Sequence, residues 1–593
     1  GIVLNNGSSL ISSGTGAINI NGIGGASSGN GNRGVALDNT TVQTAGADLT
    51  ITGTGGGTGS SNSNDGISIT SSGNTILAGA GTITLNGTAN PVGASSESLS
   101  GDGVATIGGA TQTGDVMLRG DNIWFGSSSN ISTVQTSGAF TLEPYSNSFE
   151  GVAFSWPMSG LTLSGDENTV TLGKDGNTFD MTISGATTVA GDLTVYGGAI
   201  AVNAATTATS STLTLDGTTI SGAGALTSSK AVLESSTSTN LTGAVTATDV
   251  SLLGAGSATL SSTSSDFTTL EAGTTSQAVG ALSITESNGF TVGSVDNAGI
   301  NSSGNIDLST QTGDLTISEA IATTATSTSA IVANAGKSKS VGDATGGNLI
   351  VSGNGALTMG SGAIAKLFSS DDASSTGLAA LAASYDDVFP GYDESSDLSG
   401  FTLSGDKTYV FYRASSGSLT VTPSLVNFSH CGVGNSDPVA ITISGTSLAQ
   451  DVTVTVPNGY ELATTSTGTY QSSLTLTQTS GTLASTTIYA RATATISAEG
   501  SADLTLTSGT VSETVALVNG LNNSIDFDGT DDYLEITNTG QFDLTTMTLE
   551  GWFNADVVTT LGNNPVLFNM RTGDNSSLSR FSIHINVNNN EVT

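Results

Sequence analysis

The chain has 593 residues, among them 79 Gly and only 8 Pro, and charged residues make up 10% of it. Its formal net charge of −37 argues against nucleic acid as a partner, which requires a basic surface, and against binding to an anionic lipid surface. No apolar run is long enough to span a bilayer, and the single cysteine, Cys431, excludes an internal disulfide.

From residue 1 to residue 361, short apolar pairs recur with one residue between their members. This alternation places both members of a pair on one face of a β-strand, and the Gly, Asn, Asp and Ser between pairs favour tight turns. Such short strands cannot bury a core alone, so we predict that they stack as a parallel β-solenoid with coils of about 20 residues. We expect Thr171 and Thr182 to point outward and the following to point inward: Val170, Leu172, Met181, Ile183, Leu193 and Val195.

Family resemblance in this region is carried by three segments, which read TLEPYSN, LTLSGDENTVTLGKDGNTFDMTIS and GDLTVYGGAIAVNA. They resemble the filamentous-haemagglutinin-type repeats of large bacterial exported adhesins. The resemblance covers about the first 400 residues. It implies a right-handed parallel β-helix and export to the cell surface.

Residues 362–416 interrupt the repeats, and we interpret them as a helix-containing cap with a closing rung. The spacing of apolar residues predicts a helix over 376–388, with Thr376 as its cap. The following acidic segment, DDVFPGYDESSD, suggests either a calcium site or a solvated loop that covers the end of the solenoid. The loop interpretation is favoured because this spacing does not specify converging oxygen ligands. The segment YVFYR resembles the closing rung of the adhesin repeats.

Residues 417–521 contain about seven longer alternating strands, the number and length typical of an immunoglobulin-like sandwich. The segments LTVTPSLVNFSHCGVGNSDPVAITISGTSL and VTVTVPNGYELATTSTGTY resemble an Ig-like module of secreted Bacteroidetes proteins. That resemblance implies a spacer and type IX secretion. His430 and Cys431 are adjacent, but a metal or nucleophile site needs further partners, and a buried structural cysteine is favoured.

Residues 522–593 contain FDGTDDYLEI and LEGWF, which resemble the opening of a laminin-G-like, concanavalin-like jelly roll. A complete domain of this kind needs about twice as many residues, so we expect the chain to stop inside it. The resemblance implies that calcium could bind at Asp528, Asp531 and Asp532, beside Asp526. A hairpin turn, for which Asp-Gly is favoured on backbone grounds, is the preferred alternative.

Catalysis is not expected. Basic residues are scattered through the first 345 residues, which contain no histidine, and the elbow-like segment 25–29 (GASSG) is expected by chance in such a composition. We therefore predict a non-catalytic adhesin or stalk at the bacterial surface or outside the cell. Its partners would be a surface polysaccharide or protein ligand and a secretion or anchoring machinery, and gliding adhesion is one possible role. The alternative is a non-catalytic portion of an extracellular polysaccharide-degrading enzyme.

Overall fold

The computed structural model divides the chain into two units, Gly1–Asn522 and Asn523–Thr593. In the first unit it describes residues 1–90, 95–126, 130–150, 154–372, 374–381, 385–394, 396, 398, 402–414, 417–428, 434–448, 450–479, 481–496, 500–509 and 511–519. In the second it describes only the backbone of three antiparallel strands, β50 (Val566–Met570), β51 (Phe581–Asn586) and β52 (Glu591–Val592). The described parts are nearly all β, as the alternating sequence predicts.

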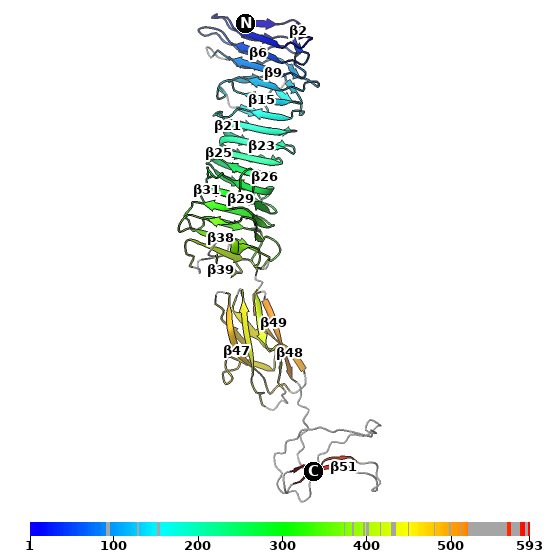
Figure 1. Cartoon of the computed structure of the whole chain (residues 1–593), viewed down its shortest axis with the longest axis vertical. Coiled ribbons are helices and arrows are strands. Elements are labelled where there is room, and N and C mark those ends of the chain that lie inside the picture. Colours follow the sequence, from blue (N-terminus) through cyan, green and yellow to red (C-terminus); the bar gives the residue numbers. More distant parts are fainter. Residues whose placement is uncertain are drawn as a thin grey trace. The chain divides into compact units, whose positions relative to one another are not determined.

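The first coils each contribute one strand to each of three parallel sheets (Figure 1). The first sheet contains β1 (Ile2–Leu4), β4 (Val35–Leu37), β7 (Ile67–Ile69), β10 (Leu99–Gly101) and β13 (Ile123–Phe125). The second contains β2 (Ser9–Ser12), β5 (Thr41–Thr44), β8 (Asn74–Leu77), β11 (Ala105–Gly108), β14 (Ser132–Gln135) and β17 (Leu161–Leu163). The third begins with β3 (Ile18–Ile23), β6 (Leu49–Thr54), β9 (Ile83–Thr88), β12 (Val116–Arg119), β15 (Ala139–Glu143) and β18 (Thr169–Leu172).

Beyond β15 the parallel pairing continues to residue 412, and we call β1 to β40 the parallel stack. Its remaining strands are β16 (Phe154–Trp156), β19 (Met181–Ile183), β20 (Thr187–Val189), β21 (Asp192–Val202), β22 (Thr206–Ala208), β23 (Thr212–Gly222), β24 (Leu226–Thr227), β25 (Lys230–Leu241), β26 (Val245–Leu253), β27 (Ser257–Leu260), β28 (Asp266–Ala272), β29 (Leu282–Glu286), β30 (Phe290–Val292), β31 (Ile300–Ser302), β32 (Ile306–Thr310), β33 (Leu315–Ile317), β34 (Ile321–Thr323), β35 (Ile331–Asn334), β36 (Leu349–Val351), β37 (Leu357–Thr358), β38 (Ile364–Ser369), β39 (Tyr385–Pro390) and β40 (Lys407–Tyr412). This pairing is compatible with a β-solenoid.

One in-register column of apolar residues shows how the stack forms its core. Each member pairs with the equivalent residue of the next coil, and all are buried. Alternation keeps this face apolar in every coil, so each added coil buries the open face of the one before it. The column runs Ile18, Leu49, Ile83, Val116, Phe140, Val170, Leu193, Leu213, Ala231, Val250, Leu270, Val292, Ile317 and Val351.

The six residues predicted to point inward are all buried, with at most 2% of their surface exposed, which confirms the predicted register. Thr171 and Thr182 are only half-buried, in agreement with an outward orientation. The predicted coil length is right only in the middle of the stack. Leu193 pairs with Leu213 and Leu213 with Ala231, which gives coils of 20 and 18 residues.

In the first coils the predicted length is wrong. Ile2 pairs with Val35 and Val35 with Ile67, so these coils contain 33 and 32 residues. The additional residues lie in corner loops whose own polar groups also stack from coil to coil. The Asn64 Oδ1 atom, for example, accepts hydrogen bonds from the backbone N–H of Asn32 at 3.3 Å and from its Nδ2 at 3.1 Å. Long corners are therefore tolerated, because their buried polar groups are paired between coils.

The predicted helix over 376–388 is wrong. Among the described residues of this segment the helical structure is one 3-10 turn, η1 (Leu378–Ala380), and its N-cap is Gly377 rather than Thr376. Residues 385–390 instead form β39, which pairs in parallel with β40. Because β40 also pairs with β38, it lies between two strands that both precede it in the sequence. Pairing with the exposed edge of β40 satisfies backbone groups that a helix would leave unpaired on that edge.

Residues 417–519 form a region of two mainly antiparallel sheets around one core, which we call the two-sheet region. One sheet contains β41 (Ser418–Thr422), β43 (Val439–Thr446), β47 (Leu483–Ala492) and β45 (Tyr460–Ala463). The other contains β42 (Leu425–Asn427), β49 (Val511–Asn519), β48 (Gly500–Ser508), β44 (Val452–Thr455) and β46 (Ser473–Leu476). Buried residues such as Ile441 and Ile488 of one sheet pack with Leu504 and Val515 of the other.

Candidate functional site

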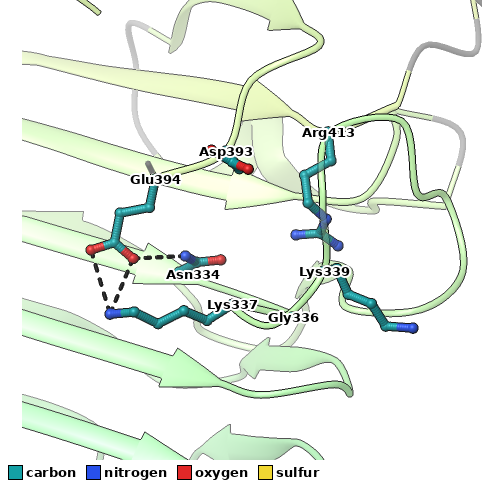
Figure 2. A pocket seen from close by; sticks show the side chains of 7 residues that line it. All are labelled: Asn334, Gly336, Lys337, Lys339, Asp393, Glu394 and Arg413. Carbon is teal, nitrogen blue, oxygen red and sulfur yellow. Dashed lines mark hydrogen bonds and ion pairs between the residues drawn. The ribbon is translucent and has the colours of Figure 1, made fainter. Parts of the chain in front are cut away.

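A pocket of about 300 Å³ lies near the last coils of the parallel stack (Figure 2). The segments that form it are the end of β35, the loop after it, residues 393–394, and the residue that follows β40. These segments are distant in the sequence and meet because β38, β40 and β39 stack in register. The lining residues are Asn334, Gly336, Lys337, Lys339, Asp393, Glu394 and Arg413.

Arg413 is the most unusual residue of the pocket, because only 1% of its surface is exposed. Its Nη1 donates to the Ala335 carbonyl at 2.5 Å, and its Nη2 donates to the carbonyls of Gly346 and Gly347 at 3.0 and 2.9 Å. The Nε–H group is buried and has no acceptor. Among the residues that the structure describes, no carboxylate forms an ion pair with Arg413.

Glycine is required where the chain passes Arg413. Gly336 and Gly347 both have positive φ, at 77° and 73°. A Cβ atom on Gly347 would lie 2.8 Å from Nη2 of Arg413 and 2.7 Å from the Cα of Gly336. The two glycines therefore let the loop close over the guanidinium group. Burial lowers the pKa of Arg413, and the nearby charges of Asp343, Asp393 and Asp371 oppose this shift. The group stays cationic at neutral pH.

The other polar groups of the pocket form two smaller networks. Glu394 accepts a hydrogen bond from Asn334 Nδ2 at 2.7 Å, and its Oε2 lies 3.2 Å from Lys337 Nζ. Lys339 Nζ lies 3.6 Å from Asp343 Oδ2. Figure 2 shows Glu394, Asn334 and Lys337 on one side of the pocket and Arg413 with Lys339 on the other. One wall thus holds the Glu394 carboxylate with its partners Asn334 and Lys337, and the other holds Arg413 and Lys339.

A second candidate is a shallow acidic groove of about 280 Å³ on the side of the stack. Tyr196, Asp216 and Glu234 occupy equivalent positions on β21, β23 and β25, so parallel register brings the side chains of successive coils together. Burial raises the pKa of Asp216 to about 6, and Glu234 and Asp175 add to this effect. Burial also raises the pKa of Tyr196, and the charges of Asp216, Asp175 and Glu234 add to this effect. Asp216 therefore exchanges a proton near neutral pH.

Two glycine turns lie at the groove, since Gly254 lines it and Gly173 borders the lining residues Asn177 and Tyr196. Gly173 ends β18 with φ at 81°, and a Cβ there would lie 2.4 Å from the Tyr196 carbonyl oxygen. Gly254 follows β26 with the same φ, and its Cβ would lie 2.2 Å from the carbonyl oxygen of Ser235. Only glycine permits both the positive φ and this close approach of neighbouring coils. The groove offers carboxylates and a phenol, but within the described ranges no three His, Cys, Asp or Glu side chains are placed so that they could hold a metal ion.

The sequence-predicted site residues lie elsewhere. Asp528, Asp531 and Asp532, with Asp526, are outside the described residues, and so are His430 and Cys431. Part of the predicted acidic loop is the strand β39, while Asp393 and Glu394 line the pocket. The 25–29 segment is part of the connection between β3 and β4, without the strand–turn–helix context of a nucleophile elbow.

Sequence reasoning missed both Arg413 and the groove. The signal for Arg413 was a cation directly after the apolar strand KTYVFY, where the closing coil ends. The signal for the groove was the spacing of 18 residues between Asp216 and Glu234, which equals the local coil length. Each signal has meaning only once the register of the coils is known.

Comparison of the chain with protein-family models, with curated proteins and with solved structures gave no match. In the part of the chain that the structure describes, no helix has the length and apolar character needed to cross a membrane.

Proposed function

We propose that this chain is a non-catalytic adhesin or stalk of the bacterial cell surface, in which the parallel stack is a right-handed β-helical rod. The observation that carries this proposal is the continuous in-register column from Ile18 to Val351. Each coil contacts only its neighbours, so a stack of this kind extends by repetition and separates its two ends. Separation of a surface from a ligand is what a stalk provides.

The charge and the sequence resemblances support the same proposal. A net charge of −37 favours solubility and discourages self-association in an exposed position. In this proposal the two-sheet region is an Ig-like spacer. In the same proposal the segment 522–593 is jelly-roll-like and binds a surface polysaccharide or a protein, with calcium at Asp528, Asp531 and Asp532 as an option. Export by a type IX system and a role in gliding rest on the resemblance alone.

Antibody labelling of intact cells of the source organism tests the proposal. An antibody against the outward face of β23 and β25 should label cells without permeabilisation, and surface proteolysis should remove the signal. Labelling that requires permeabilised cells would contradict a surface location. Adhesion of chain-coated beads to a polysaccharide panel, compared with beads coated with residues 1–414, would test the proposed binding role of the C-terminal part.

The alternative is a non-catalytic portion of an extracellular polysaccharide-degrading enzyme. Both proposals place a β-helical rod outside the cell, so surface labelling does not distinguish the adhesin from the enzyme portion. Polysaccharide hydrolysis by the native polypeptide that contains this chain would favour the alternative over an adhesin.

A further inference from the structure

The pocket around Arg413 concentrates positive charge in an acidic chain. Three of the protein's 12 lysine and arginine residues line it, although the net charge is −37. Two of these cations form ion pairs, Lys337 with Glu394 and Lys339 with Asp343. Arg413 is the lining cation for which no ion pair occurs among the described residues.

No described carboxylate forms an ion pair with the guanidinium of Arg413, although the charges of Asp343, Asp393 and Asp371 lie near enough to favour its cationic form. Three carbonyl oxygens accept its hydrogen bonds, but their partial charges cannot neutralise a full buried positive charge. Buried charges are ordinarily paired, because removal of a charge from water costs much more than removal of a neutral group. A buried arginine that borders a cavity and has one N–H without an acceptor points to an anion in that cavity.

The opposite wall limits what this anion is. Glu394 and Asp393 would repel a simple inorganic anion that filled the pocket. The same carboxylates accept hydrogen bonds from hydroxyl groups, and the amide of Asn334 belongs to this wall. A ligand with a carboxylate at one end and hydroxyl groups at the other matches both walls. The volume of about 300 Å³ admits one sugar residue.

We infer that this pocket binds a hydroxylated carboxylate of the uronic-acid class. The carboxylate lies toward Arg413 and Lys339, and the hydroxyl groups lie toward Glu394 and Asn334. This assignment goes beyond the proposed stalk function and does not depend on it, since a stalk without this site would still be a stalk.

Titration calorimetry of the full chain with sodium glucuronate, at low ionic strength, tests the inference. We expect saturable binding with a Kd on the order of 1 mM, the range that a single sugar residue reaches. Glucose lacks the carboxylate and acetate lacks the hydroxyl groups, so both should bind at least about tenfold more weakly. Equal binding of acetate or sulfate would overturn the uronic-acid assignment.

Variants localise the site. Arg413→Met removes three hydrogen bonds and is liable to disturb the fold, so the decisive change is Lys339→Met, whose side chain is 25% exposed. It should weaken glucuronate binding at least about tenfold, because a charge-assisted contact is lost. Lys174→Met is the matched control, since Lys174 lies outside the pocket lining, and it should bind like the original chain. Absence of saturable binding, or equal loss in the Lys174 variant, would overturn the proposal.

Discussion

The parallel stack and the two-sheet region bury their apolar side chains in different ways. In the stack, the partner of each core residue occupies the same position one coil later, as Leu193 does with Leu213. In the two-sheet region, the partners of core residues come from distant parts of the segment, as when Val426 pairs with Leu517. The stack therefore has a core that is assembled coil by coil, whereas the two-sheet region has one core that closes only when both sheets are present.

This difference predicts how much of each region a destabilising substitution unfolds. In a repeat architecture, stability is close to a sum of coil and interface contributions, so a defect remains near its coil. A single closed core of about 100 residues unfolds as one cooperative unit. Substitutions that are matched in burial should therefore have local effects in the stack and global effects in the two-sheet region.

The largest expected effect is that of Leu193→Asp in the stack. Leu193 is fully buried, so the variant places an unpaired carboxylate in the apolar column and should cost several kcal/mol. Hydrogen exchange should show loss of protection in β18, β21 and β23 and retained protection in the two-sheet region. Thr194→Asp, at the neighbouring half-buried position, is the control and should have little effect. Equal damage from both variants would mean that the register is wrong.

A smaller but more widespread effect is expected for Leu504→Ala in the two-sheet region. Leu504 is fully buried between the sheets, and loss of its side chain should reduce the free energy of unfolding by about 2–5 kcal/mol. All strands from β41 to β49 should lose protection together. Protection lost only in β48 and its direct neighbours would refute the cooperative core.

Asp216→Asn should change stability by less, and in a pH-dependent way. The folded-state pKa of about 6 lies above the unfolded value, so the stabilising contribution of the protonated carboxyl is fully present below pH 4. It is lost as the pH rises through 6. At pH 7.5 the variant should be more stable than the original chain by about 1 kcal/mol, after a discount for solvent screening. Thermal unfolding at pH 4 and 7.5 checks this. A gain in stability that is equal at pH 4 and pH 7.5 would exclude titration of Asp216 as the cause of that gain.

The smallest effect is expected for Glu461→Gln. The Glu461 carboxylate accepts from Arg491 at 2.9 Å, but the two side chains are 34% and 26% exposed. Ion pairs of this exposure contribute less than about 1 kcal/mol, and Arg491 keeps its position over the ring of Tyr470. The melting temperature of the two-sheet region should fall by no more than a few degrees, and by less at high salt. A larger loss would show that this surface pair is coupled to the core.

Much of the parallel stack could be predicted from the sequence, because its signal is local. The alternation at Val170/Leu172 and Met181/Ile183 correctly predicted which side chains are buried. The predicted helix failed for the opposite reason. Its apolar spacing at Leu378, Leu381 and Tyr385 fits a helix, but the open edge of β40 recruits 385–390 as a strand. A non-local partner overrode a local preference.

The sequence by itself determined the all-β character and the inward-facing residues, since both follow from the alternation of neighbouring residue types. It also determined the composition, in which charged residues are few and mostly acidic. Only the tertiary structure decided the coil lengths, the position of β40 between β38 and β39, and the meeting of Asn334, Glu394 and Arg413 in one pocket. It also decided the contact between Asp216 and Glu234. The physical reason is that each residue pairs with one a whole coil away in the sequence. The number of residues in a coil depends on loop length, which local patterns do not encode.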